Sequence, residues 1–182
     1  MPDLIAQADA AGYKLMFGET CPLGRDASKG RGRRVAILTD SNTPAEDITK
    51  KGDPITDFLL STGRWIERLI PLDNGQQMLV ATLYGYSGAS SCANAYIDNE
   101  KLVAAAITRM KCMGNIPYFI NADVNVDPAT SKILQLAIEA ELAFDIVDDA
   151  NDGQPKPTFS RGGISKEMAG AGTSRIDTVI TN

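Results

Sequence analysis

Three polar side chains follow a short apolar run at alternate positions of the chain. Asp123, Asn125 and Asp127 come after Tyr118 to Ile120 and Asn121. Alternate residues of an extended chain point the same way, so Asp123 and Asn125 are expected on one side. A carboxylate and an amide so placed suit water activation and contact with a metal ion or phosphate oxygen. The same residues suit a plain turn and helix cap, which the spacing alone favours.

The composition limits the functional classes. A length of 182 residues suits one domain spanning 1–182, and 43% hydrophobic with 23% charged residues is typical of a soluble globular protein. The net charge of −5 argues against a general nucleic-acid coat, although a metal-dependent phosphate site is itself built from carboxylates. No apolar run approaches the roughly 20 residues of a membrane span, and the first residues lack signal-peptide features. An intracellular location without a membrane partner is the default expectation.

Histidine is absent from the sequence, which therefore offers no Ser-His or Cys-His pair and no His-ligated metal. The cysteines Cys21, Cys92 and Cys112 are too few and too scattered for a disulfide framework or a zinc site. Any hydrolytic chemistry in this chain must rest on carboxylates, amides and hydroxyls.

Several elements are expected to position these side chains. Asn74-Gly75 between the apolar runs 65–72 and 78–83 predicts a hairpin. Helical spacing predicts a helix over 99–113, and a second helix is expected behind Pro128 with Asp127 as its N-cap. The polar stretch 40–56 is interpreted as a surface excursion. Further strands are predicted at 35–38, 117–121, 144–149 and 174–181. Mostly antiparallel strands with a few helices favour a layered α/β sandwich over a doubly wound sheet.

The order of several segments resembles the endonuclease/exonuclease/phosphatase superfamily. Thr82-Leu83-Tyr84, Ala122-Asp123-Val124-Asn125, Thr158-Phe159 and Arg175-Ile176-Asp177-Thr178 are similar to the family's Asn-x-Tyr, Gly-Asp-x-Asn, Thr-Phe and Arg-Ile-Asp-Tyr motifs. Upstream, the stretches 10–18 and 32–40 resemble its Gly-Tyr segment and its Gly-Val-Ala-Ile-Leu strand. The resemblance implies the DNase I-like fold, an αββα sandwich of four layers with two mostly antiparallel sheets.

The resemblance also implies roles for four residues. Asp123 would orient or deprotonate the attacking water, and Asn125 would bind a phosphate oxygen or sit beside the metal. Tyr84 would donate its hydroxyl to the phosphate, and Asp177 would orient a catalytic histidine. In the family, one or two Mg²⁺ (or Mn²⁺) ions stabilise charge in the transition state; Asp123 and Asn125 would be the metal ligands here. Tyr84 can instead be a plain strand aromatic, and Asp177 can form an ion pair with Arg175.

Two family features have no counterpart in this sequence: an N-terminal metal-binding Glu before the Gly-Tyr segment, and a C-terminal Ser-Asp-His. Glu19 is a candidate for that Glu, but it follows the Gly-Tyr segment and is interpreted as a loop residue. The chain is therefore expected to be the middle of a catalytic domain, lacking part of both ends and inactive by itself. Its expected substrate is a phosphate ester, with nucleic acid one candidate; the oligomeric state is undetermined. The alternative is a non-catalytic remnant, or a fragment of a retroelement-derived endonuclease, that serves as a binding or structural module.

Overall fold

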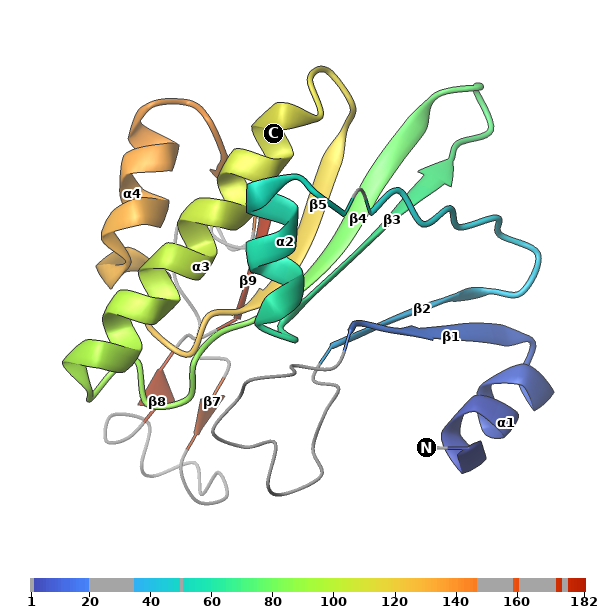
Figure 1. Ribbon diagram of the computed structural model, residues 1–182, viewed down its shortest axis with the longest axis horizontal. Helices are drawn as coiled ribbons and strands as arrows, with labels where there is room; N and C mark the ends of the chain where they lie inside the picture. The colour runs from blue at the N-terminus through green and yellow to red at the C-terminus, as the bar shows by residue number, and fades with distance from the viewer. Residues whose placement is uncertain (1, 20–34, 50, 147–158, 161–172, 175–176) are drawn as a thin grey trace.

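A central sheet and a smaller one organise the structure, a computed structural model shown in Figure 1. The larger sheet has five strands in the order β3-β4-β5-β9-β6, and the smaller is the antiparallel pair β1-β2. Helices α2, α3 and α4 lie together on one side of the larger sheet (Figure 1). The residues that the structure describes are 2–19, 35–49, 51–146, 159–160, 173–174 and 177–182.

The predicted hairpin is confirmed as β3 (Trp65–Pro71) and β4 (Gln77–Tyr84). Their antiparallel register runs from Trp65 opposite Leu83 to Pro71 opposite Gln77. The side chains alternate, so that every second residue enters the core under the helices. Members of that face include Trp65, Leu79, Ala81 and Leu83, each at most 1% exposed.

The centre of the sheet is β5 (Tyr118–Asp123), which is parallel to β4 and antiparallel to β9 (Asp177–Thr181). Helix α3 (Ala93–Cys112) makes the crossover between the two parallel strands. Strand β9 also pairs antiparallel with β6 (Phe144–Asp145). The predicted mixture of mostly antiparallel strands with a few helices is thus confirmed.

The small sheet consists of β1 (Tyr13–Phe17) and β2 (Ala36–Asp40), with α1 (Pro2–Ala10) in contact with β1. Met16, Val35 and Ile37 form a second apolar cluster with Ile66 of β3. Because Ile66 alternates with Trp65, this cluster lies on the face of the larger sheet away from the helices. A short pair, β7 (Phe159–Ser160) and β8 (Thr173–Ser174), completes the described strands.

Two expectations about helix starts were wrong. The stretch 40–56 is not irregular to its end, because α2 (Pro54–Ser61) begins inside it. Asp53 caps this helix by accepting a hydrogen bond from the Thr56 backbone N–H at 2.8 Å, and proline follows at the first helical position. The helix 99–113 likewise begins earlier than expected, at Ala93.

The helix expected behind Pro128 is divided in two. Asp127 caps only a 3₁₀ turn, η2 (Pro128–Thr130), through the Ala129 N–H at 3.0 Å. The α-helix proper, α4 (Lys132–Glu139), begins later and is capped by Ser131, whose hydroxyl accepts from the Leu134 N–H at 3.3 Å. Within the described residues, no helix has the length and apolar character needed to cross a membrane.

Candidate functional site

The strand register brings three of the predicted site residues into one row. Tyr84 is opposite Asp123 in the parallel pair β4–β5, and Asp123 is opposite Asp177 in the antiparallel pair β5–β9. Arg64, just before β3, extends the row because its carbonyl accepts from the Tyr84 N–H at 3.0 Å. We call Arg64, Tyr84, Asp123 and Asp177 the polar row. It lies at one end of the larger sheet.

Three members of the polar row, Arg64, Tyr84 and Asp123, belong to the face of the sheet away from the helices. The preceding residues in the two strands, Leu83 and Ala122, are buried under the helices. Because side chains alternate along a strand, Tyr84 and Asp123 point to the other side. The small sheet covers this side, since Thr82 Oγ1 donates to the Ala36 carbonyl at 3.3 Å. Tyr84 and Asp123 are half-buried, so the strands hold them firmly while part of each side chain reaches solvent.

Asn125 joins the row by a turn and not by extended spacing. Strand β5 ends at Asp123, and Asn125 has φ of 52°, in the left-handed region that Asn tolerates. Its backbone N–H donates to Asp123 Oδ1 at 3.1 Å, and its Nδ2 donates to the Gly85 carbonyl at 3.3 Å. The expected pairing of Asp123 with Asn125 is thus present, but it results from the turn that was weighed as the alternative.

Gly85 brings the end of β4 against the end of β5. Its N–H donates to the Asp123 carbonyl at 2.6 Å. A Cβ at Gly85 would lie 2.6 Å from the Val124 carbonyl oxygen and 2.6 Å from Asn99 Oδ1. Asn99, which is fully buried in α3, also accepts from the Tyr86 N–H at 3.0 Å. The close approach therefore requires glycine.

Arg64 is a site residue that the sequence analysis missed. Its guanidinium lies over the rings of Tyr86 and Tyr84, with centroid distances of 4.1 and 5.3 Å. Its Nη1 donates to the Tyr84 carbonyl at 3.1 Å and to the Gly85 carbonyl. The Tyr84 hydroxyl is 3.4 Å from Ser87 Oγ, in the loop that Gly85 begins. Nothing in the local sequence marks Arg64, because its partners are far away along the chain.

The oxygen ligands of the site suit a divalent cation whose remaining ligands are water and substrate. In the part of the chain that the structure describes, no three or more acidic, Cys or His side chains gather as a ready-made metal centre. Mg²⁺, however, commonly takes only one or two protein carboxylates, together with water and substrate phosphate oxygens. The Asp123 carboxylate and the Asn125 amide oxygen fit that pattern, with Asn125 Nδ2 turned toward Gly85.

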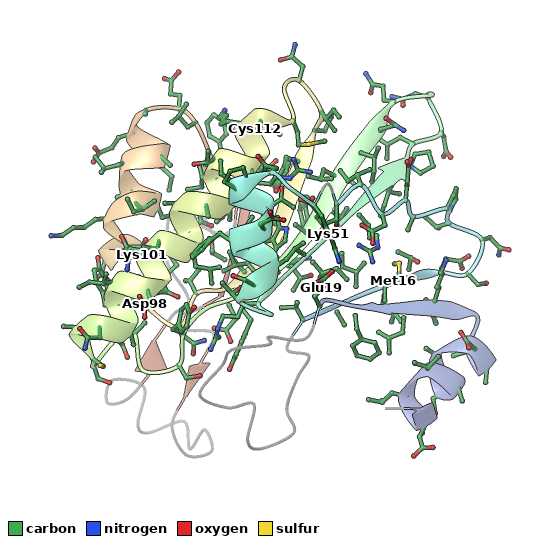
Figure 2. The ribbon with its side chains drawn as sticks, in the orientation of Figure 1. Met16, Glu19, Lys51, Asp98, Lys101 and Cys112 are labelled. Atoms are coloured by element: carbon green, nitrogen blue, oxygen red, sulfur yellow. The ribbon has the colours of Figure 1, made fainter. Side chains whose placement is uncertain are left out.

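Glu19 lies away from the polar row. Its carboxylate forms an ion pair with Lys51 Nζ at 3.1 Å (Figure 2). Both residues line a cavity of about 320 Å³ beside the edge strand β3, together with Trp65, Glu67 and nearby residues but with no member of the row. Its interpretation as a residue outside the metal site agrees with this position.

Two further parts of the resemblance lie outside the described residues: Thr158 and Arg175-Ile176. The ion pair weighed between Arg175 and Asp177 is therefore not described. Asp177 is placed by its backbone register alone.

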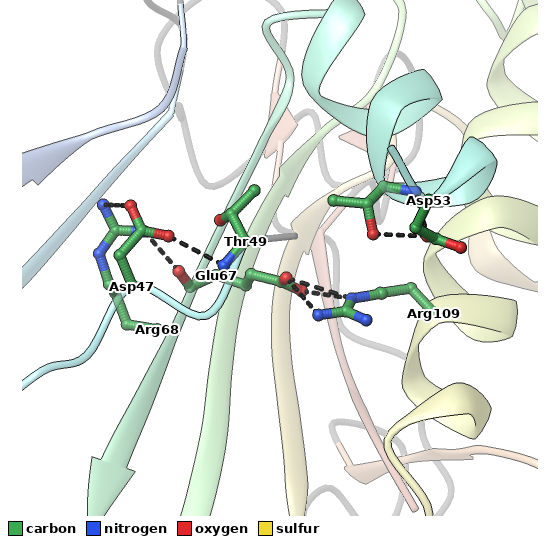
Figure 3. Close-up of polar contacts among 7 residues, drawn as sticks. Asp47, Thr49, Asp53, Glu67, Arg68 and Arg109 are labelled. Carbon is green, nitrogen blue, oxygen red and sulfur yellow. Dashed lines mark hydrogen bonds and ion pairs between the residues drawn. The ribbon is translucent and has the colours of Figure 1, made fainter. Parts of the chain in front are cut away.

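A second polar cluster lies on the helix side of the sheet (Figure 3). Glu67 of β3 accepts from Arg109 Nη2 at 2.8 Å and from Nε at 3.1 Å, and both residues are buried. Burial lowers the pKa of Arg109, but the hydrogen bond and charge of Glu67 outweigh it and raise that pKa overall. Burial raises the pKa of neighbouring Tyr118 well above its usual value. The cluster lies on the opposite face of the sheet from Arg64, Tyr84 and Asp123.

Comparison with known proteins finds similarity in structure and not in sequence. No protein-family model and no curated protein matches the chain. The structure does match the catalytic domain of human Nocturnin with bound sulfate, at TM-score 0.61 and 12% identity, over 98% of this chain and 63% of that one. It also matches an AP endonuclease from Archaeoglobus fulgidus, at TM-score 0.65 and 13% identity, over 97% of this chain and 69% of that one.

A third match is a mannosyl-6-phosphatase from Bacteroides thetaiotaomicron, at TM-score 0.58 and 15% identity, over 100% of this chain and 67% of that one. The chain has the DNase I-like fold. The predicted fold class is confirmed, and the resemblance to the endonuclease/exonuclease/phosphatase superfamily is supported at the level of the DNase I-like fold. The chain spans less than two thirds of the Nocturnin domain, and at these identities the likeness establishes the fold alone.

Proposed function

We propose that the polar row and Asn125 bind a divalent cation and a phosphate ester, as the site of a hydrolase of the nuclease or phosphatase class. The single observation that carries the proposal is the register of Tyr84, Asp123 and Asp177 on three adjacent strands, with Asn125 hydrogen-bonded to Asp123. Carboxylates, an amide and a phenol at one end of the sheet suit in-line attack of water on phosphorus.

Each residue has a distinct part in this proposal. The Asp123 carboxylate accepts a proton from the attacking water or orients it, and Asn125 holds a phosphate oxygen or the cation. The Tyr84 hydroxyl donates to a phosphate oxygen, and Asp177 supplies a second carboxylate at the row. A bound Mg²⁺ or Mn²⁺ would neutralise charge on the phosphate and the leaving oxygen.

The substrate class is a phosphate ester, with nucleic acid as one candidate. Structures with the same fold include an AP endonuclease, a mannosyl-6-phosphatase and a zebrafish (D. rerio) TDP2 complexed with a single-stranded DNA product. These names span nucleic acid and small phosphate esters, so the fold supports both. We also infer that residues 1–182 form a single partial domain of the endonuclease/exonuclease/phosphatase type.

Slow hydrolysis by the chain itself is part of the proposal. The chain lacks the family's histidine, a general acid/base or charge-stabilising group worth about 10²- to 10⁴-fold in rate, and Asp123 would act without it. We therefore expect little or no Mg²⁺-dependent cleavage of bis-p-nitrophenyl phosphate. Robust cleavage that Asp123→Ala abolishes would contradict that expectation while supporting the assignment of Asp123.

Cation binding gives the sharper test. We expect Mn²⁺ to broaden the NMR resonances of Tyr84, Asp123 and Asn125 first, and Asp123→Asn to remove this effect. Asp127→Asn is the matched control, because Asp127 is an exposed cap on the same segment and should leave the broadening intact. Broadening that is absent, or that survives in Asp123→Asn, would instead favour the non-catalytic binding or structural module.

A further inference from the structure

Arg64 is buried beside the proposed site, and the proposed function gives it no role. The whole residue is 6% exposed, an unusual position for a charged side chain unless its charge is satisfied. It stands opposite Tyr84 across the β3–β4 pair, so both side chains lie on the face of the polar row. Its burial brings a planar five-donor group against the loop that joins β4 to α3.

Two tyrosine rings and two carbonyls hold the guanidinium in one orientation. Tyr86 and Tyr84 stack on it at 4.1 and 5.3 Å from their centroids. From that position Nη1 donates to the carbonyls of Tyr84 and Gly85. A planar guanidinium held by aromatic faces is pre-organised for such a bridge, whereas a lysine ammonium lacks both the plane and the fork.

The Gly85 carbonyl connects Arg64 to the proposed ligands. The same oxygen that accepts from Arg64 also accepts from Asn125 Nδ2 at 3.3 Å. A carbonyl oxygen has two lone pairs, so both donors can be accommodated. If the Asn125 amide were flipped, its oxygen would face the Gly85 oxygen, an acceptor against an acceptor. Holding this carbonyl in place therefore fixes which end of the Asn125 amide points away from the loop.

We propose that Arg64 is the positioning residue of this site: through the Gly85 carbonyl it fixes the amide oxygen of Asn125, and through ring stacking it fixes Tyr84. The proposal rests on the proposed function for what Asn125 and Tyr84 do, but not for the link between Arg64 and Asn125. It requires no contact between Arg64 and the substrate. Partners that orient metal ligands in this way typically contribute about 10- to 100-fold to metal affinity.

The first test measures the link without any metal or substrate. Arg64→Met removes the bridge at similar side-chain length, and Arg64→Lys keeps the charge but not the fork. We expect both variants to shift the Asn125 side-chain amide resonances and the Tyr84 ring resonances. Arg68→Met is the matched control, because Arg68 lies on the same face of β3 but pairs with Asp47 at 3.2 Å, outside the row. Unchanged Asn125 resonances in Arg64→Met would overturn the proposal.

The second test is a double-mutant cycle on Mn²⁺ affinity. We expect Arg64→Met and Asn125→Ala each to weaken binding about 10- to 100-fold, and the double variant to be no weaker than the worse single variant. If the fold-losses in Mn²⁺ affinity of the two single variants multiply in the double variant, Arg64 acts independently of Asn125, and the proposal is overturned. If wild type shows no Mn²⁺ site while the Asn125 resonances still respond to Arg64→Met, the proposed function fails and the positioning link stands.

A third variant pair keeps the test valid if Arg64→Met does not fold. Tyr86→Leu removes the nearer ring and leaves Arg64 and the other members of the polar row unmutated. We expect the same resonance shifts in Asn125 and Tyr84, but smaller. Tyr86→Phe retains the ring and should restore wild-type spectra. The emission of Trp65, the single tryptophan, monitors the fold beside Arg64 in every variant. Equal spectra for Tyr86→Leu and Tyr86→Phe would count against the stacking part of the proposal.

Discussion

At the scale of single residues, the buried carboxylate of Glu67 is costly to leave unpaired. It is 1% exposed on β3, and its described partner is Arg109 of α3 (Figure 3). The free-energy cost of removing two charges from water is offset only when the charges attract each other in good geometry. The pair also ties the central helix to the edge strand of the sheet.

Arg109→Met is therefore expected to lower the free energy of unfolding by about 3–5 kcal/mol, because it leaves Glu67 buried and uncompensated. The double variant Glu67→Leu with Arg109→Met should recover most of that loss, since no charge is then buried. Urea denaturation of the two single variants and the double variant gives the coupling energy. A loss below about 1 kcal/mol for Arg109→Met would show that water reaches Glu67.

At the scale of residues, the sequence carries information only on contacts within one short segment. Asp123 and Asn125 are two positions apart, and their hydrogen bond is a local turn that Asp and Asn favour. Arg64 and Gly85 were missed because their contacts depend on tertiary structure: the register of β3 with β4 and the approach of β4 to β5. No spacing rule within one segment contains that information.

At the scale of elements, the segment between β5 and α4 contains two consecutive helix caps, one for the 3₁₀ turn and one for α4. Asp127 caps the 3₁₀ turn, and Ser131, which is fully buried, caps α4. The Ser131 hydroxyl also donates to Glu100 Oε1 of α3 at 2.7 Å, while Glu100 Oε2 accepts from the Ile133 N–H at 2.8 Å. The start of α4 is thereby fixed to the crossover helix.

Ser131→Ala should lower the free energy of unfolding by about 1–2 kcal/mol, because it removes the cap and one hydrogen bond of a partly buried carboxylate. Asp127→Ala serves as the comparison: its cap is exposed and closes a single turn, so we expect a smaller loss. Thermal or urea unfolding of both variants measures the difference. An equal or larger loss in Asp127→Ala would contradict the assignment of Ser131 as the principal cap.

Elements with strong local signals were predictable, and their starting points were not. The Asn-Gly hairpin and the buried strand β5 follow from short-range patterns. The start of α2 at Pro54 carries a valid Asp-Pro signal, which was outweighed by the polar composition around it. At the start of α4, Asp-Pro and Ser131 compete for the same role, and contacts with Glu100 favour Ser131.

At the scale of the whole molecule, the predicted layered fold was recoverable because the order of motifs follows the order of strands. Tyr84 and Asp123 end their strands and Asp177 begins β9, yet the register brings these three residues, far apart in sequence, to the same end of one sheet. The order of segments predicts that arrangement only through resemblance. Physical reasoning from one sequence does not specify which strands become neighbours, because register is set by long-range packing.

The pH range of global stability is a further property of the whole molecule. Hydrogen bonds from Thr56 lower the pKa of Asp53. Burial raises the pKa of Asp47, but hydrogen bonds from Thr49 and the charge of Arg68 outweigh it, so that pKa is also lowered. Burial raises the pKa of Tyr118, whose hydroxyl has no hydrogen-bond partner among the described residues.

The signs of these shifts predict a plateau with two falling limbs. A lowered carboxyl pKa gives stability that is present above the unfolded value of about 4 and is lost as the pH falls through the folded pKa. A raised tyrosine pKa gives stability that is complete below about pH 10 and is lost as the pH rises toward the folded pKa. Urea midpoints should therefore be highest between about pH 5 and pH 9.

Tyr118→Phe isolates the alkaline limb. It removes the titrating hydroxyl but keeps the ring that packs in the core, so the fall above about pH 10 should be shallower. At neutral pH the variant should be equal to or more stable than wild type, by up to about 1 kcal/mol, because an unpartnered buried hydroxyl is removed. Tyr13→Phe, on the exposed start of β1, controls for loss of a tyrosine as such. An unchanged alkaline limb in Tyr118→Phe, or a loss at neutral pH, would mean that the hydroxyl is hydrogen-bonded to water in solution.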